Sequence, residues 1–261
     1  MLKKKIKQIA IIGSTASGKS QLAIDIAKEF NAIILSLDSL SVYKEIDIAS
    51  AKPTIKERDD IPHYGIDILL PNTPFDVTIF MHLYKEVYEV ALVDGKNLII
   101  VGGTSFYLKS LIDGISPIPK LSKENQKEID LEMRDVDSVY KKLYDIDREY
   151  MQNISSSDKY RVEKALSIYI STNTPPSIYF KNNRPKSTII GKLPIYSILT
   201  QRDILRKRVA KRTQMMIDIG LIDEVAYLEK KYNRSPNSMK SIGIKETLEY
   251  FDGKYNMDML K

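Results

Sequence analysis

The segment Gly13–Ser20 constrains the possible folds of this chain more than any other stretch of its sequence. It reads GSTASGKS and fits the pattern G-x-x-x-x-G-K-[ST] at every fixed position. Residues 6–12 before it are rich in isoleucine and predict a buried strand, and residues 21–30 after it predict a helix. A glycine loop between a strand and a helix is a phosphate-binding loop, and this context disfavours an incidental glycine-rich turn.

The physical chemistry of this loop predicts a site for a di- or triphosphate. Gly13 and Gly18 let the backbone turn so that several N–H groups point inward, and these groups attract an anion together with the N-terminus of the following helix. Lys19 adds a positive charge for terminal phosphate oxygens, and the hydroxyl of Ser20 is suited to bind Mg²⁺. The predicted phosphate-binding residues are Gly13, Ser14, Thr15, Ala16, Ser17, Gly18, Lys19 and Ser20.

Apolar and helical segments alternate in the first 115 residues and again after residue 190. Strands are predicted over 31–37, 97–101 and 193–199, and helices over 75–93, 105–112, 201–219, 221–231 and 241–251. In the helix of residues 21–30, the side chains expected to face the core are Leu22, Ala23, Ile26, Ala27 and Phe30. The alternation predicts an α/β fold, with a P-loop NTPase-like parallel sheet core flanked by helices.

Residues 117–185 differ from the flanking sequence because they contain no strand pattern. They begin with Pro117 and Pro119, continue with charged helical segments, and end in a proline- and asparagine-rich stretch over 173–185 that predicts a loop. We therefore predict two domains. Residues 1–116 and 186–261 form the catalytic α/β core, and residues 117–185 form a mainly helical insertion.

The composition restricts the classes of partner. Forty basic against 34 acidic residues give a formal net charge of +6, which permits a polyanionic partner without requiring one. The absence of cysteine excludes disulfides and thiol nucleophiles and is consistent with a reducing cytoplasm. No apolar run approaches the ~18 residues that a membrane helix needs. We expect a cytoplasmic monomer that does not contact a membrane.

Acidic residues at strand ends bear on the reaction class. Nucleotide-hydrolysing enzymes with such a loop usually place an acid after an apolar strand to hold magnesium. Here the predicted strand 97–101 runs into Gly102-Gly103-Thr104, and Asp38, after strand 31–37, is the only acid at a strand end. This pattern weakens the interpretation as an ATPase. Asp38 either holds the metal, as in a small-molecule kinase, or performs other chemistry beside the loop.

The predicted helix 201–219 carries a cluster of basic residues. Six of them fall within eleven positions: Arg202, Arg206, Lys207, Arg208, Lys211 and Arg212. Arg208 and Arg212 share a helical face with Ile204 and Met215. Arginines on a partly apolar inner face favour a buried phosphate, because the guanidinium fork binds phosphate oxygens in pairs. A solvated charged face remains the alternative for the helix as a whole.

A series of further motifs accompanies the glycine loop in a specific order. They are Leu37-Asp38-Ser39, Val42-Tyr43-Lys44, Asp47-Ile48-Ala49, Ala51-Lys52-Pro53, Pro62-His63-Tyr64-Gly65-Ile66-Asp67-Ile68 and Ile100-Val101-Gly102-Gly103-Thr104. In order and spacing the first 115 residues resemble the tRNA dimethylallyltransferase family, also called tRNA isopentenyltransferases. A weaker match continues through Ala165-Leu166, the helix around Arg208 and residues 241–243.

The resemblance implies both an activity and its partners. The reaction would transfer a dimethylallyl group from dimethylallyl diphosphate to N6 of the adenine 3′-adjacent to the anticodon of a tRNA, with Mg²⁺, and would release diphosphate. The glycine loop would then bind a departing diphosphate, which accounts for the missing hydrolytic acid. The helical insertion would move against the tRNA anticodon stem-loop.

The resemblance also implies roles for individual residues. Asp38 would accept the proton from the adenine amine, Thr104 would hydrogen-bond the reacting group, and Arg208 would stabilise the leaving diphosphate. The residues implied to bind tRNA are Asp38, Ser39, Leu40, Ser41, Thr104, Gln126, Tyr160, Arg161 and Lys164. Each role has a structural alternative: Asp38 could be a magnesium ligand or a helix cap, and Thr104 an N-cap.

Three alternatives to this activity stay open at the level of sequence. A small-molecule or nucleotide kinase would use the same loop, a non-catalytic RNA-binding module would use only the basic helix, and a related enzyme would prenylate free AMP. The sequence also leaves the exact prenyl donor and the set of modified tRNAs undetermined.

Overall fold

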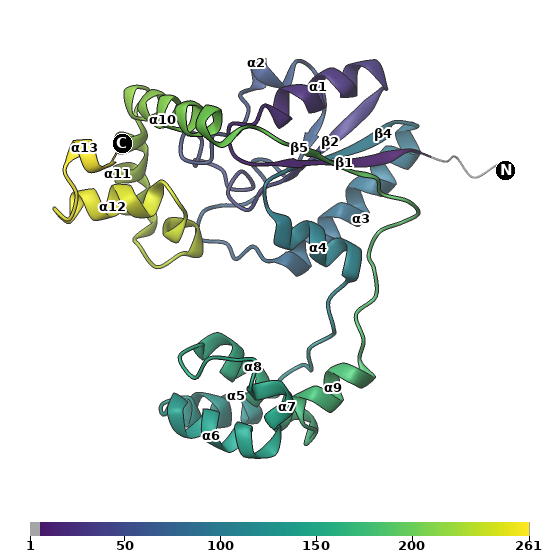
Figure 1. Cartoon of the computed structure of the whole chain (residues 1–261), viewed down its shortest axis with the longest axis vertical. Coiled ribbons are helices and arrows are strands. Elements are labelled where there is room, and N and C mark those ends of the chain that lie inside the picture. The colour runs from purple at the N-terminus through teal and green to yellow at the C-terminus, as the bar shows by residue number, and fades with distance from the viewer. Residues whose placement is uncertain (1–5, 261) are drawn as a thin grey trace. The chain divides into compact units, whose positions relative to one another are not determined.

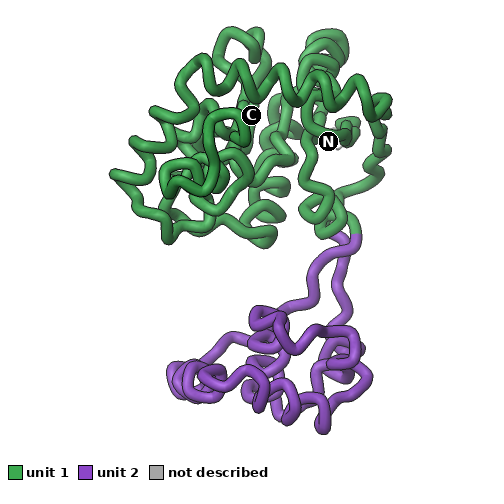
Figure 2. Tube along the Cα trace, turned by 60° about the vertical axis from the view of Figure 1, so that its left-hand side comes forward, with its two compact units in different colours: residues 1–112, 188–261 green, residues 113–187 purple. Residues whose placement is uncertain are grey.

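The computed structural model describes residues 6–260, which form two compact units. The first unit comprises the chain up to Ile112 and from Thr188 onward, and the second spans Asp113–Ser187 (Figure 2). The segment 117–185, predicted as an insertion, lies within this second unit. None of the helices in residues 6–260 has both the length and the apolar character that a membrane crossing requires.

The first unit contains a parallel five-stranded sheet with the strand order β3-β2-β4-β1-β5. The strands are β1 (Gln8–Gly13), β2 (Ala32–Leu37), β3 (His63–Tyr64), β4 (Asn97–Gly102) and β5 (Ile195–Ile198). The predicted α/β class is therefore confirmed. Gly102 of β4 is paired in register with both Ile12 and Leu37, so the carboxyl ends of the three central strands lie side by side.

Helices cover both faces of the sheet (Figure 1). On one face, α1 (Lys19–Glu29) packs Ala23, Ile24 and Ala27 against strand residues such as Ile34. On the other face, α3 (Val77–Asp94) and α4 (Ser105–Asp113) form a core with the remaining strand side chains. Because the central strands β1, β2 and β4 are largely buried on both faces, they read as continuous apolar runs in the sequence.

The predicted inner stripe of α1 is partly wrong. Leu22 is 41% exposed and Phe30 56% exposed, whereas Ile24, which the prediction left out, is buried. The spacing alone fits two neighbouring stripes on this helix. The helix turns Ala23 and Ala27 toward the sheet, because small side chains let its backbone approach the strands closely.

The C-terminal helices of the first unit form a second core. These elements are α10 (Arg202–Asp218), α11 (Leu221–Tyr232), the 3₁₀ helix η1 (Asn237–Lys240), α12 (Ile244–Phe251) and α13 (Met257–Leu260). Leu221, Val225 and Ile244 pack against Val42 and Ile46, which follow β2.

The helix predicted over 241–251 starts later than expected, at Ile244. Gly243, with a φ of 90°, precedes its first turn. Between β2 and β3 lies the short helix α2 (Ile55–Arg58).

All secondary-structure elements of the second unit within the described residues are helices. It contains α5 (Lys123–Glu132), α6 (Val136–Ile146), α7 (Arg148–Met151), α8 (Lys159–Thr172) and α9 (Pro176–Asn182) around an apolar core. Asp158 caps α8 by accepting a hydrogen bond from the N–H of Arg161. The prediction of a loop over 173–185 is wrong, because the helix α9 begins within this segment at Pro176. Proline is favoured in the first turn of a helix.

The end of β4 supplies a stability prediction. A Cβ atom placed on Gly102 would lie 2.0 Å from the carbonyl oxygen of Leu37, and a Cβ on Gly103 would find its nearest neighbour at 3.6 Å. We expect Gly102→Ala to lower the free energy of unfolding by about 3 kcal/mol, because two hydrogen-bonded strands would have to separate. Gly103→Ala is the matched control. Urea unfolding of both variants tests this, and equal stabilities would contradict the packing argument.

Candidate active site

The glycine loop lies between β1 and α1, as predicted from the sequence. Gly13 ends the strand, Lys19 begins the helix, and the loop closes with a hydrogen bond from the N–H of Ser17 to the carbonyl oxygen of Ser14 at 3.2 Å. Gly18 precedes the helix with a φ of 90°, a conformation that favours glycine. No side chain caps this helix N-terminus. Its first N–H groups therefore remain available to an anion.

A cavity of about 560 Å³ opens at this helix N-terminus. Three segments supply its lining: the loop with the first turns of α1, the residues before and within α2, and the basic helix α10. The lining residues are Ala16, Gly18, Lys19, Ser20, Gln21, Ile24, Ala51, Pro53, Glu57, Arg208 and Arg212. The fold thus brings together the loop and the two arginines that the sequence analysis singled out.

The arginines of α10 reach the cavity from an exposed helix rather than from a buried face. Arg208 donates to the carbonyl oxygen of Ala16 at 3.4 Å, and Arg212 donates to that of Ala51 at 3.2 Å. No residue of α10 is buried, and Ile204 and Met215 are 43% and 54% exposed. The expected apolar inner face is therefore wrong. The helix contacts the loop through Arg208, and Met216 and Ile217 near its C-terminal end pack against the core of the C-terminal helices.

The electrostatics of the cavity favour an anionic ligand. Burial lowers the pKa of Lys19, the positive charge of Arg212 lowers it further, and the carboxylate of Asp38 opposes both effects. Burial likewise lowers the pKa of Arg212. Two cationic side chains that are both half-buried repel each other, and a bound polyanion would relieve this repulsion.

The lowered pKa of Lys19 leads to a pH prediction. A cation beside an amine disfavours its protonated form, so removing that cation should raise the pKa. We expect the amine of Lys19 to become reactive toward acetic anhydride at a lower pH than an ordinary lysine, whose pKa is 10.5. In Arg212→Met this onset should move to higher pH. Mass spectrometry of the acetylated peptides measures it, and an unchanged onset would contradict the coupling.

Asp38 stands directly after β2, on the same edge of the sheet as the loop. Its Oδ1 accepts hydrogen bonds from the N–H groups of Leu40 at 2.8 Å and Ser41 at 3.0 Å. Within residues 6–260 its Oδ2 has no hydrogen-bond partner. Its charge acts on both Lys19 and Arg212. The carboxylate is thus fixed in its own turn and caps no helix. Its other oxygen has no partner within the described residues, and its charge acts on two of the cations that line the cavity.

Thr104 follows β4, next to the end of β2. Its N–H donates to the carbonyl oxygen of Leu37 at 3.3 Å, which places it beside the residue that precedes Asp38. The Thr104 hydroxyl makes no hydrogen bond to the part of the chain that the structure describes. The side chain of Thr104 therefore does not cap α4, which was the alternative to a catalytic role. Its hydroxyl is available to a ligand.

The turn after Asp38 presents only one of its three predicted tRNA-binding side chains. Ser39 is exposed, whereas Leu40 and Ser41 are buried. The hydroxyl of Ser41 lies 3.0 Å from that of Ser36, and Leu40 belongs to the core beneath the C-terminal helices. Because these two side chains are packed, only the backbone atoms of Leu40 and Ser41 are open to a substrate, and their role in tRNA binding stays a prediction.

The other predicted tRNA-binding residues lie in the second unit. Tyr160, Arg161 and Lys164 are on α8. The ring of Tyr160 is 70% exposed, and the Lys164 Nζ lies 5.5 Å from its centroid. Arg161 pairs with Asp158 in the first turn of the helix. On α5, the side-chain amide of Gln126 donates to Asp130 at 2.8 Å.

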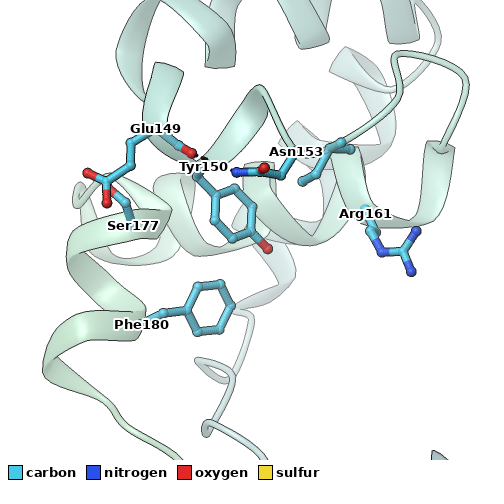
Figure 3. Close-up of a pocket in the computed structure, with 7 residues that line it drawn as sticks. Glu149, Tyr150, Asn153, Arg161, Ser177 and Phe180 are labelled. Atoms are coloured by element: carbon cyan, nitrogen blue, oxygen red, sulfur yellow. Dashed lines mark hydrogen bonds between the residues drawn. The ribbon is translucent and has the colours of Figure 1, made fainter.

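A cavity of about 420 Å³ within the second unit includes Arg161 (Figure 3). Its aromatic wall consists of Tyr150 and Phe180, whose rings stack with centroids 5.5 Å apart at an angle of 25°. This cavity was not predicted from the sequence. Tyr150 is on α7 and Phe180 on α9, and only the packing of these two helices brings them together.

Lys52 explains part of the motif series in structural terms. Its side chain is only 6% exposed, and its Nζ donates to the carbonyl oxygen of Tyr43 and pairs with the carboxylates of Asp47 and Asp67. These residues stabilise the segment that follows β2. In the sequence these residues stand out only as a family signature, although the small residues closed by a proline over 48–53 already indicate a packed loop.

Comparisons with known proteins decide the family. A family model described as IPP transferase matches residues 41–261. The chain belongs to the IPP transferase family. A tRNA dimethylallyltransferase of Sulfurovum sp. (strain NBC37-1) is 56% identical over 232 residues, which are 89% of this chain and 77% of the relative.

Solved structures of IPP transferases share the fold. A tRNA delta(2)-isopentenylpyrophosphate transferase from Staphylococcus epidermidis superimposes with a TM-score of 0.66 at 31% identity and covers 98% of this chain and 84% of that one. A eukaryotic dimethylallyltransferase acting on tRNA gives a TM-score of 0.83 at 28% identity, over 95% of this chain and 64% of that one. The resemblance noted in the motifs is thus confirmed over nearly the whole chain.

Proposed function

We propose that this protein transfers a dimethylallyl group from dimethylallyl diphosphate to N6 of the adenine 3′-adjacent to the anticodon of a tRNA, releasing diphosphate. One observation carries the mechanism. Asp38 follows β2 at the edge of the sheet where the uncapped N-terminus of α1 lies, and one of its carboxylate oxygens has no partner within the described residues. Its charge acts on Lys19 and Arg212, two cations that line the cavity. A site for a diphosphate leaving group and a proton acceptor for the nucleophile are therefore neighbours.

The cavity at α1 is the site for the diphosphate. As the bond between the allylic carbon and the bridging oxygen breaks, negative charge grows on the diphosphate. The N–H groups at the start of α1 and the charges of Lys19, Arg208 and Arg212 stabilise this charge without reorganising. No hydrolytic acid is required, because phosphorus is not attacked.

Mg²⁺ fits the same cavity. Ser20 lines it, and its hydroxyl has no hydrogen-bond partner within the described residues. Mg²⁺ usually binds through few protein groups and completes its shell with water and substrate phosphates. Ser20 would hold the ion, with Asp38 as the alternative ligand. When bound, the ion neutralises charge on the departing diphosphate.

Asp38 and Thr104 act on the other reactant. The exocyclic amine of adenine is a weak nucleophile, because its lone pair is delocalised into the ring. Its nitrogen forms a bond to the allylic carbon while the carbon–oxygen bond breaks, and its proton passes to the free oxygen of Asp38. The unpaired hydroxyl of Thr104 hydrogen-bonds the reacting group and orients it.

The tRNA contacts come from exposed and partly exposed side chains in both units. Ser39 and the backbone around it hold the displaced loop next to Asp38, while Tyr160, Arg161, Lys164 and Gln126 contact the anticodon stem-loop. An exposed tyrosine ring offers a stacking surface for an unpaired base, and cations bind the phosphate backbone. The adenine must leave its stack at a cost of a few kcal/mol, which is smallest in a single-stranded loop.

One assay tests the activity. Labelled dimethylallyl diphosphate is incubated with tRNA, with AMP and with ATP plus tRNA, and label transfer and ATP turnover are measured. We expect transfer to tRNA alone. Transfer to AMP would indicate the small-molecule acceptor, ATP turnover would indicate a kinase, and binding of tRNA without product would indicate an RNA-binding module. The monomeric state and the cytoplasmic location stay predictions.

A further inference from the structure

Glu224, in the first turn of α11, makes an unusual set of contacts across the first unit. Its carboxylate accepts hydrogen bonds from three consecutive N–H groups, those of Asp47 at 2.9 Å, Ile48 at 2.8 Å and Ala49 at 2.9 Å. Hydrogen bonds to an ionised acceptor are stronger than neutral ones. A single side chain of α11 therefore fixes the backbone of residues 47–49, some 175 positions away in the sequence.

The turn that Glu224 holds is not one that its own sequence would favour. Ala51 has a φ of +47°, in the left-handed region that residues with a Cβ rarely adopt, and its N–H closes the turn on the carbonyl oxygen of Ile48 at 2.9 Å. Such a conformation persists only where surrounding contacts determine it. Glu224 supplies these contacts on one side of the turn, and the ion pairs made by the buried side chain of Lys52 supply them on the other.

This turn borders the cavity at α1. Ala51 and Pro53 line the cavity, and the carbonyl oxygen of Ala51 accepts the hydrogen bond of Arg212. The place of the Arg212 guanidinium over the cavity thus depends on where the Ala51 carbonyl points. A continuous series of contacts leads from Glu224 through residues 47–49 to Ala51 and then to Arg212.

We propose that Glu224 is a positioning residue for the diphosphate site. It touches no substrate. It holds the turn of residues 47–51 so that Ala51 forms the wall of the cavity and orients Arg212 toward the diphosphate. The inference rests on the proposed function, because it takes the cavity at α1 as the site of the diphosphate.

A purely structural role would give a different result. Leu221, Val225 and Leu228 already bury the inner face of α11 against the core, so the helix does not need Glu224 to stay folded. Glu229 on the same helix is the matched control, because it pairs with Arg234 and makes no contact with the turn. Removing either carboxylate removes one charge from α11, but only Glu224 is connected to the cavity.

The experiment is a double-mutant cycle on the full chain. Glu224→Ala, Arg212→Met, the double variant and Glu229→Ala are compared by calorimetric titration with inorganic diphosphate and by KM for dimethylallyl diphosphate and for tRNA. We expect Glu224→Ala to weaken diphosphate binding about tenfold, as follows from misplacing one charge-assisted hydrogen bond. The KM for tRNA and the binding of Glu229→Ala should match the wild type. In the Arg212→Met background the Glu224→Ala change should add little, because the two residues act in series.

Two results would overturn the inference. One is wild-type diphosphate affinity in Glu224→Ala, and the other is a full additional loss in the double variant. Should Glu224→Ala not fold, Glu224→Gln replaces it, since its amide keeps one acceptor oxygen and should show a smaller loss in the same direction. A wild-type chain that binds no diphosphate would overturn the proposed function, whereas equal binding by wild type and variant overturns only the role of Glu224.

Discussion

Replacing Asp38 by alanine is expected to lower the rate of dimethylallyl transfer to tRNA by about 10²–10⁴-fold, the usual contribution of a positioned general base. The affinity for dimethylallyl diphosphate should remain close to that of the wild type, because the N–H groups and cations of the cavity are unchanged. The rate should fall because the unpartnered carboxylate oxygen of Asp38 is the proposed proton acceptor, and the charge of Asp38 acts on Lys19 in the cavity. Single-turnover measurements with saturating donor isolate the chemical step from product release.

Asp38→Asn separates proton acceptance from the shape of the turn. The amide oxygen of asparagine can still accept the hydrogen bonds from Leu40 and Ser41, but the side chain is no longer a base. We expect it to transfer as slowly as the alanine variant. An asparagine variant with most of the wild-type rate would show that Asp38 is not the base. A rate restored by higher Mg²⁺ would assign Asp38 to the metal instead.

Replacing Lys19 by methionine should remove both diphosphate binding and transfer. The ammonium group is a half-buried point charge in the cavity, and loss of one preorganised donor to a developing negative charge costs about 10²–10³-fold in rate. Methionine keeps the length and the apolar stem of the side chain. Inorganic diphosphate titrated against the variant measures the binding part of the loss, and single-turnover transfer measures the remainder.

Lys28 provides the control on the same helix. It lies in the last turn of α1, is half exposed and pairs with Asp59, away from the cavity lining. Lys28→Met therefore removes the same charge from α1 but should leave binding and transfer unchanged. Comparable losses in the two variants would mean that the net charge of the helix matters rather than the ammonium group in the loop, and the site assignment would be withdrawn.

Two kinds of element could be predicted from the sequence. In one the hydrogen bonds join residues that are close together in the chain, and in the other the apolar residues form a continuous run. Gly13–Ser20 requires a strand before it and a helix after it, and the apolar runs 31–37 and 97–101 are typical of strands buried on both faces. The helix α9 was not predicted, because a proline at its start and asparagines at its end are also typical of a loop. Which stripe of α1 faces the sheet was ambiguous, because two stripes fitted the same spacing.

The sequence by itself determined the glycine loop, the carboxylate that follows the second predicted strand and the class of the sheet, since each depends on residues close together in the chain. Only the tertiary structure decided which side chains complete the cavity. Arg208 meets Ala16 across 192 positions, and Glu224 meets Ala49 across 175. A repeat of polar and apolar residues restricts which faces of a helix can be buried. It does not specify which distant backbone carbonyl or N–H group an exposed side chain will meet, because the packing of whole helices sets those contacts.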